Sequence, residues 1–463
     1  MTSALLAQST AHPVDDDQPA SRRAAPIRSP ESTSFPAPRP NRSLMAVLGV
    51  VNRWLILRAR LRVTAIDLPS ADLGRLREAV NPDTAAFLAP NHAEFGLDWM
   101  IDKEISTMVA PHMGAWAAHE IIAGAPWFWT RNNLISNRGG EQAFEYSVRC
   151  ALRGDGVLLH PEGMVRWTSD VVHPLFDGVA RMAVDAAARV ANGEERPVYI
   201  VPLVWKLSYT GDVSTGIHAD MAHIERELNL PSGDGYTVRE RFRRLQENVL
   251  RVQMTRFGFD DGPVANLDFF ARQEAFRAYL TDELASRHGM PRRALDERAL
   301  RRLAKTVADR QARARVREAE RLGGFSRAVY DTPTLAQEHI HESLKRIRAD
   351  LVTRGARNVA HNFLPTPYGP RVAHVRVPGP ILIDPRLAAG SEHDRAAYAA
   401  HLTERTHTAM QEALDTVNRE IGPDVDHFRR PNPFYTNTCV SPGREPLSAD
   451  ELPPSHSPDG PIQ

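Results

Sequence analysis

The sequence predicts an α/β protein in which helices flank a mixed sheet and a large all-helical insertion interrupts the sheet domain. Three observations favour this fold class. Short apolar runs alternate with helical patterns from residue 61 to about 204, as in a layered α/β sheet. Only helical patterns continue to about residue 355, and two strand-like runs then return. The insertion is therefore expected at 217–360, between the two parts of one domain at 44–216 and 361–425.

The first 43 residues are rich in Pro, Ser, Ala and Arg, a composition that buries too little apolar surface to offset the entropy of ordering. We predict a disordered tail at 1–43. The next segment, 44–60, predicts a helix with Trp54 and several arginines on it. Its apolar side chains at helical spacing are Leu44, Val47, Leu48, Val51 and Leu55. Such a helix either lies in a membrane interface or packs on the core, and both interpretations fit these residues.

The first part of the sheet domain should contain alternating strands and helices. Strands are expected at 61–66, 85–89, 156–160 and 198–204. Helices are expected at 73–80, 99–108, 140–152 and 178–191. We expect reactive side chains in the loops at the strand ends, because loops on a rigid sheet can present them to solvent.

The insertion and the closing part of the domain follow in order. Helical patterns in the insertion cover 237–257, 267–288, 291–322 and 333–353. The third of these is dense in arginine, which fits a solvated helix with i,i+4 ion pairs or a face that touches anionic lipid heads. The closing part should supply strands at 371–377 and 381–384 and a helix at 393–421. A second disordered tail is expected at 426–463, which is rich in Pro and Ser.

Composition excludes several classes of protein. Lys plus Arg number 57 and Asp plus Glu number 57, so the formal charge is zero, unlike the basic excess of a dedicated nucleic-acid binder. The two cysteines, Cys150 and Cys439, exclude a disulfide scaffold and a Cys-based metal cluster, and they favour a reducing compartment. No apolar run approaches the roughly 20 residues of a membrane-spanning helix. We therefore expect a cytoplasmic protein, soluble or peripheral to a membrane.

The clearest chemical signal is the run from Ala89 to Asp98, which contains Asn91 and His92 and follows a short apolar strand. A histidine at a strand end with a nearby carboxylate is a general-base arrangement. The carboxylate binds one ring nitrogen and fixes the tautomer, and the other nitrogen takes the proton. Asp98 is the favoured partner because it is nearer the strand end, and Asp102 is the alternative at i+4 on the same helix face.

Three further blocks follow in order: Trp127 to Asn133, Leu158 to Arg166 with Pro161-Glu162-Gly163, and Tyr199 to Val204. With the first block, this order resembles the glycerolipid acyltransferase family, which includes glycerol-3-phosphate and 1-acylglycerol-3-phosphate O-acyltransferases. The resemblance covers roughly 62–210 and 366–420. Two departures stand out. Five residues separate His92 from Asp98, where the family has four, and Arg166 lies one position later than the family's arginine.

The resemblance implies transfer of a fatty acyl group from acyl-coenzyme A or acyl-carrier protein to a hydroxyl of a glycerol-phosphate or lysophospholipid-type acceptor. The implied catalytic residues are His92, Asp98 and Glu162, and the implied substrate-binding residues are Asn91, Arg131, Gly163 and Arg166. Arg131 and Arg166 would anchor a phosphate, since a guanidinium matches its geometry. The resemblance implies no metal or other cofactor, no nucleic-acid partner, and a place at the inner face of a membrane.

Two other functions remain open at the sequence level. A metal-dependent hydrolase would gather His92, His112, His119, Glu120 and His160 around a cation, although no HExxH motif occurs. A catalytically inactive lipid- or partner-binding protein of the same fold would explain the displaced Asp and Arg. No G-x-S-x-G, G-x-x-x-x-G-K-[ST] or G-x-G-x-x-G run is present to support a serine hydrolase or a nucleotide site.

Overall fold

The computed structural model describes residues 35–94, 96–163, 165, 167, 170–191, 196–289, 299–300, 303, 307, 309–325, 327, 330–353 and 364–435. These residues divide into two compact units. Residues 274–323 belong to one unit, and 32–273 together with 324–463 belong to the other. All of the sheet and all of the candidate site described below lie in the second unit.

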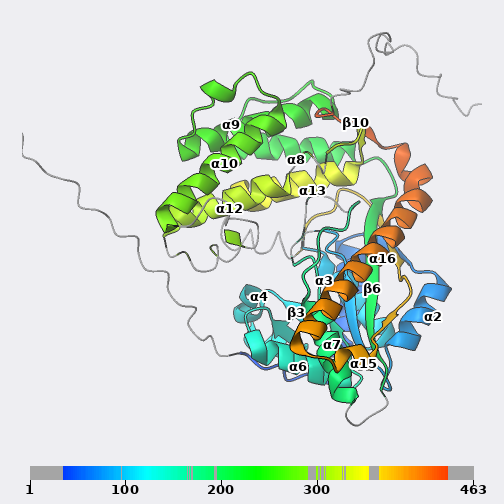
Figure 1. Cartoon of the computed structure of the whole chain (residues 1–463). Helices are drawn as coiled ribbons and strands as arrows, with labels where there is room; N and C mark the ends of the chain where they lie inside the picture. Colours follow the sequence, from blue (N-terminus) through cyan, green and yellow to red (C-terminus); the bar gives the residue numbers. More distant parts are fainter. Residues whose placement is uncertain are drawn as a thin grey trace, which may run out of the picture. The chain divides into compact units, whose positions relative to one another are not determined.

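The second unit is an α/β structure built on a mixed sheet, which confirms that part of the predicted fold class (Figure 1). Its strands are β1 (Val63–Asp67), β2 (Ala85–Pro90), β3 (Gly114–Ala117), β4 (Leu134–Ser136), β5 (Val157–Leu158), β6 (Val198–Tyr209), β8 (Arg371–Arg376) and β9 (Ile381–Leu382). The order across the sheet is β1-β8-β6-β2-β5-β3-β4, and β9 also pairs with β6. Strands β8 and β9 run antiparallel to β6, and the other pairs are parallel.

The described residues also form helices before and after strand β6. Those before β6 are α1 (Arg42–Val51), the π-helical η1 (Asn52–Arg60), α2 (Ser70–Ala79), α3 (Asp98–Val109), α4 (His119–Gly124), α5 (Pro126–Arg131), α6 (Gly140–Leu152) and α7 (Gly178–Val190). Those after it are α8 (Ser214–Glu227), α9 (Val238–Phe257), the 3-10 turn η2 (Gly262–Val264), α10 (Phe269–His288), α12 (Arg310–Gly324), α13 (Gln337–Ile347), the π-helical η5 (Arg348–Val352), α15 (Pro385–Ala388) and α16 (Glu392–Asp426).

The two cores follow from the period-two alternation of a strand. On β2, Phe87 points into a core shared with α6, α7 and α16, while its neighbour Leu88 points into a core shared with η1, α2 and α3. All six residues of β2 are buried, as expected for a central strand covered by helices on both faces. A third core joins α8, α9 and α13 through Ile217, Phe242 and Leu344.

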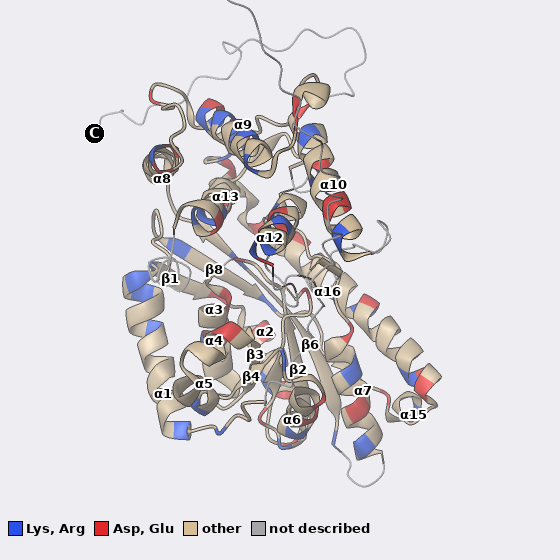
Figure 2. Cartoon of the chain, turned by 90° about the vertical axis from the view of Figure 1, so that its left-hand side faces the viewer, with Lys and Arg blue, Asp and Glu red and all other residues tan. Residues whose placement is uncertain are grey.

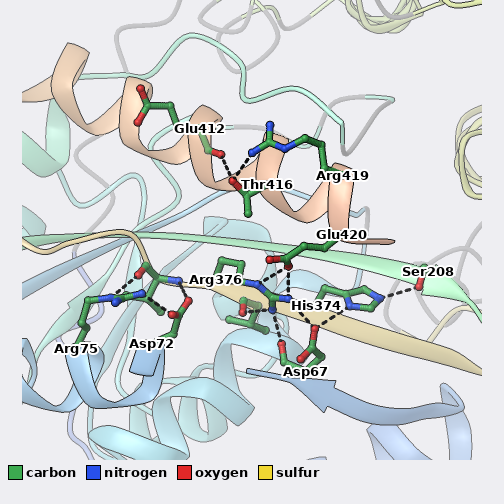
Figure 3. A network of polar contacts seen from close by, with 12 residues as sticks. Asp67, Asp72, Arg75, Ser208, His374, Arg376, Glu412, Thr416, Arg419 and Glu420 are labelled. Atoms are coloured by element: carbon green, nitrogen blue, oxygen red, sulfur yellow. Dashed lines mark hydrogen bonds and ion pairs between the residues drawn. The ribbon is translucent and has the colours of Figure 1, made fainter. Parts of the chain in front are cut away.

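The closing strand β8 is tied to the start of the domain by polar contacts (Figure 3). The Arg376 guanidinium contacts Asp67 of β1 at 2.9 Å and Glu420 of α16 at 2.5 Å. Asp72 of α2 accepts a hydrogen bond from the Val377 N–H at 2.7 Å and pairs with Arg75. Chain segments about 300 residues apart therefore form one sheet edge.

Several expected elements differ from those observed. The sequence analysis missed β3, β4, α4, α5 and α8, whose runs are too short or too polar to show a clear period. The segment expected as a helix at 333–353 begins with a short strand, β7 (Thr334–Leu335), before α13. Much of the helix expected at 291–322 lies outside the described residues, and its described part includes α12.

Regular structure extends into both of the segments that were expected to be tails. Residues 1–34 and 436–463 lie outside the described residues, but Arg39 already donates its backbone N–H to Thr130 and α1 begins at Arg42. At the other end, β10 (Arg430–Pro431) pairs with β7, and Asn432 donates to the Tyr330 carbonyl at 2.6 Å. Backbone pairing and side-chain hydrogen bonds therefore give regular structure to parts of the two segments that were predicted, from their composition, to be disordered.

Candidate active site

The candidate site begins where β2 ends. Strands β2 and β5 are parallel neighbours, so the residues after Pro90 and after Leu158 emerge at the same edge of the sheet. The first of them, Asn91, is 3% exposed, and its side-chain amide bonds the backbone of Trp205 on β6 twice. It accepts from the Trp205 N–H at 2.8 Å and donates to the Trp205 carbonyl at 3.0 Å. Asn91, predicted to bind substrate, thereby anchors the loop to the sheet.

His92 and Asp98 form a hydrogen-bonded pair. The His92 Nδ1 lies 2.6 Å from the Asp98 Oδ2, although five residues separate them. The loop turns back through Gly96, which has a φ of +81°, so that Asp98 enters α3 at its first residue. The contact places the proton of a neutral imidazole on Nδ1, which makes Nε2 the basic nitrogen. Burial raises the pKa of Asp98 to about 6.

A second pair, His160 and Asp102, lies beside the first. The His160 Nε2 is 2.7 Å from the Asp102 Oδ2, and its Nδ1 is 3.0 Å from the Asn91 carbonyl oxygen. Asp102, the alternative partner for His92, therefore binds a different histidine one helical turn further along α3. Sequence reasoning considered His160 only as a metal ligand. The signal that could have identified it is its place directly before Pro161, at the end of a strand next to β2.

The two imidazole rings are stacked. Their centroids are 4.1 Å apart and their planes are within 11° of parallel. The side chain of His92 is 19% exposed and that of His160 is 10% exposed. The two histidine–aspartate pairs therefore lie side by side, and the His92 ring is the more accessible of the two.

Glu162 joins the two strand-end loops. Its Oε1 accepts the His92 N–H at 2.6 Å, and its Oε2 accepts the His173 N–H at 3.0 Å. The residue is 3% exposed, and burial raises the pKa of its carboxyl to about 7 despite these two donors. Gly163 follows with a φ of +69° and donates its N–H to the His160 carbonyl, which is a turn that favours glycine. Both residues thus shape the loops around His92.

Of the two predicted phosphate-binding arginines, the structure describes Arg131. Arg166 lies outside the described residues. Arg131 ends α5, where its guanidinium lies 4.7 Å from the ring centroid of Trp127 and its Nη1 donates to the Trp127 carbonyl. These contacts stay within its own helix, and none of them reaches the loop of His92.

Glu94, between His92 and Asp98, is the centre of a charged cluster that the sequence did not reveal. Arg371 of β8 donates to both of its oxygens at 3.0 Å, and Lys345 of α13 lies 2.7 Å from its Oε1. Burial works against ionisation, but these two cations lower the pKa of Glu94 to about 2. A cavity of about 20 Å³, enough for one water molecule, lies beside the cluster and is lined by Glu94, Tyr209, His341 and Arg371 among others.

A serine–histidine–aspartate arrangement occurs elsewhere on the sheet. The Ser208 Oγ lies 2.8 Å from the His374 Nε2, and the His374 Nδ1 lies 3.1 Å from the Asp67 Oδ2 (Figure 3). Ser208 is only 6% exposed and lies within strand β6 rather than on a turn that would present its hydroxyl. Asp67 is also bound by Arg376. This arrangement connects β1, β8 and β6 and is not a nucleophile site.

Of the residues named for the metal-site alternative, His160 lies beside His92, whereas His119 and Glu120 make contacts elsewhere. His119 contacts Ser136 and Asn137, and Glu120 pairs with Arg138. No group of three or more metal-ligating side chains was found in the described part of the chain.

None of the helices in the described part of the chain is both long and apolar enough to cross a bilayer. No family model matches the chain, and no curated protein was found to be related to it.

Proposed function

We propose that this protein is an acyltransferase that moves a fatty acyl group from an acyl thioester to a hydroxyl of a glycerol-phosphate or lysophospholipid-type acceptor. The observation that carries the proposal is the contact between two sequence blocks. His92 is paired with Asp98 at 2.6 Å, and the His92 backbone N–H donates to Glu162 of the Pro-Glu-Gly turn. The residues that the family resemblance assigns to catalysis thus meet at one edge of the sheet.

The proposed reaction needs one base and no covalent enzyme intermediate. The Nε2 of His92 takes the proton of the acceptor hydroxyl while its oxygen attacks the thioester carbonyl. The C–S bond of the tetrahedral intermediate then breaks, and His92 returns the proton to the leaving thiolate. Asp98 stabilises the transient imidazolium through Nδ1. General-base catalysis of this kind contributes roughly 10²–10⁴-fold to the rate.

The other predicted site residues are proposed to bind and orient the acceptor. Glu162 holds the loop of His92 through the His92 backbone N–H and is proposed to orient the acceptor hydroxyls. Arg131 and Arg166 are proposed to contact the acceptor phosphate, and the donor is acyl-coenzyme A or acyl-carrier protein. No metal or other cofactor is part of this mechanism, and no nucleic acid is a proposed partner.

Helix α1 and η1 support a place at the inner face of a membrane. Large apolar side chains on this segment are exposed by more than half: Val47 59%, Val50 61%, Trp54 58% and Leu55 63%. Its charged residues are Arg42, Arg53, Arg58 and Arg60, and residues 42–60 contain no Asp or Glu (Figure 2). An exposed apolar face with basic flanks is suited to the surface of an anionic bilayer.

An acceptor screen tests the proposed activity. The purified full chain is incubated with one long-chain acyl-coenzyme A and a set of glycerol-phosphate and lysophospholipid acceptors, and products are identified by mass spectrometry. Wild type should form an acylated product, and His92→Ala should lower its rate by at least about 10²-fold. His401→Ala is the matched control, since His401 is exposed on α16. Binding of acyl-coenzyme A without turnover by any acceptor would favour the lipid-binding alternative.

A further inference from the structure

His160 lies between two hydrogen-bond acceptors. Its Nδ1 faces the Asn91 carbonyl oxygen, which can only accept, and its Nε2 faces the carboxylate of Asp102. A neutral imidazole carries one N–H, whereas an imidazolium donates from both nitrogens and satisfies both contacts. Burial alone would lower the pKa of His160, but the charge of Asp102 and the hydrogen bond to it outweigh burial and raise that pKa to about 9.

This charged ring lies against the face of the candidate base. The ring centroids of His92 and His160 are 4.1 Å apart and nearly parallel, while Asp98 contacts His92 at the ring edge. His92 is therefore held between a carboxylate at Nδ1, which favours a positive charge on the ring, and a cation on its face, which disfavours one. The Asn91 carbonyl, to which His160 donates, belongs to the residue directly before His92.

We propose that His160 and Asp102 are positioning residues that fix the ring of His92 and offset the negative charge of Asp98, so that His92 stays unprotonated near neutral pH. The consequence for catalysis rests on the proposed function. The effect of the His160 charge on the protonation of His92 is independent of that function, because it follows from the stacking of the two rings. His160 acts through His92 and not on substrate, since both of its N–H groups are used by Asn91 and Asp102.

The other charged groups around the two rings also affect the protonation of His92. In the described part of the chain, the charged groups around them include Asp98 and Asp102 of α3, Glu162 after β5, and Glu94 with its partners Lys345 of α13 and Arg371 of β8. The carboxylates favour protonation of His92. Glu94 is itself paired with two cations, and the imidazolium of His160, which is stacked on the His92 ring, acts against protonation of that ring.

The test is a titration of the histidine rings by nitrogen-15 NMR, which reports protonation without any enzyme activity. The samples are the full chain, His160→Phe, which keeps a ring on the stack without charge, and Asp102→Asn, which keeps the shape of α3 and removes the partner charge. In wild type, the His160 ring should stay doubly protonated to at least pH 8. In His160→Phe the midpoint of His92 should rise by about one pH unit, because a neighbouring positive charge is lost while Asp102 stays. In Asp102→Asn the midpoint of His160 should fall, and the midpoint of His92 should rise by less than in His160→Phe, because a carboxylate that favours protonation of His92 is lost as well.

A kinetic measurement separates this inference from the proposed function. If transfer occurs, the acid limb of kcat/KM should move upward in the same variants by the same amount. If no transfer occurs, the proposed function fails but the NMR midpoints still decide the inference. The inference is overturned if the His160 ring of wild type titrates near pH 6.5, or if the His92 midpoint is unchanged in the folded variants. Asp102→Asn keeps the test decisive if His160→Phe does not fold.

Discussion

Lys345 on α13 lies 2.7 Å from Glu94, a residue of the loop between His92 and Asp98 that is 251 positions away in the sequence. Arg371 of β8 contacts the same carboxylate at 3.0 Å. Lys345 also pairs with Glu342 on its own helix at 2.7 Å. The segment expected to be a helical insertion thus takes part in holding the candidate catalytic loop, and stability and activity should both depend on this contact.

Lys345→Met should lower the free energy of unfolding by about 3 kcal/mol. The Lys345 side chain is 3% exposed and pairs with the carboxylates of Glu94 and Glu342. Its replacement leaves both buried carboxylates without this cation, and removing one partner of a buried ion pair is strongly destabilising. Chemical denaturation at pH 7 measures the change. Arg243→Met on α9 is the control, because its ion pair with Glu247 is largely exposed and should contribute less than about 1 kcal/mol. Equal effects of the two substitutions would contradict a structural role for Lys345.

The stabilisation from Glu94 should depend on pH. Its pKa is lowered from an ordinary value of 4.5 to about 2 in the folded protein, mainly because Arg371 and Lys345 overcome its burial. A lowered folded pKa gives stability that is present above pH 4.5 and is lost as the pH falls towards 2. Such a shift corresponds to at most about 3 kcal/mol.

Glu94→Gln tests this linkage. The difference in free energy of unfolding between wild type and the variant should be largest at pH 7 and should shrink between pH 4.5 and pH 3. Denaturant unfolding across that range measures it. Glu78→Gln on α2 serves as the comparison, since the Glu78 side chain is exposed and its replacement should change stability little at any pH. A difference for Glu94→Gln that does not vary with pH would show that its ion pairs do not stabilise the fold.

The sequence was sufficient to locate the candidate base and its carboxylate. A histidine after a buried strand and an aspartate at the start of a helix are local features, and their distance is limited by a short loop. The strand and helix patterns likewise predicted β2, α6 and α7 closely and the start of β6, because each is an apolar run or has a clear apolar period. Strand β6 continues to Tyr209, five residues beyond its predicted end.

The rest of the site depends on contacts that local patterns do not encode. The stack of His160 on His92 requires β5 to lie next to β2, and strand order is a property of the whole sheet. The approach of Lys345 and Arg371 to Glu94 requires segments 251 and 277 residues apart to fold together. Arg131 was assigned to the site by resemblance, and its guanidinium contacts Trp127 of its own helix.

Asp98→Asn should lower kcat more than Asp102→Asn. Asp98 contacts the base directly, so its loss affects both the tautomer of His92 and the stabilisation of the imidazolium, with an expected decrease of about 10²-fold or more. Asp102 acts through His160, one step further from the reacting atoms. Steady-state kinetics of both variants against the same acceptor measures the ratio. The opposite order would make Asp102 the functional partner and remove Asp98 from the mechanism.

The exposed face of α1 and η1 should bind anionic membranes. Burial of a leucine side chain in the interface contributes about 1.5–3 kcal/mol, and each nearby arginine adds about 1 kcal/mol at an anionic surface. Leu55→Glu and Val50→Glu should therefore each weaken binding to phosphatidylglycerol-containing vesicles by at least about tenfold. Co-sedimentation of the full chain with vesicles measures the bound fraction.

The matched control places the same charge on another exposed apolar residue. Leu267, which is 48% exposed, lies outside this segment, and Leu267→Glu should leave vesicle binding unchanged. Binding should also fall as salt is raised, because the contribution of Arg53, Arg58 and Arg60 is screened. If Leu55→Glu and Val50→Glu bind vesicles as wild type does, the exposed face of α1 and η1 is not the membrane contact. If neutral vesicles bind equally well, the arginines have no part in it, and only the apolar side chains remain as the source of affinity.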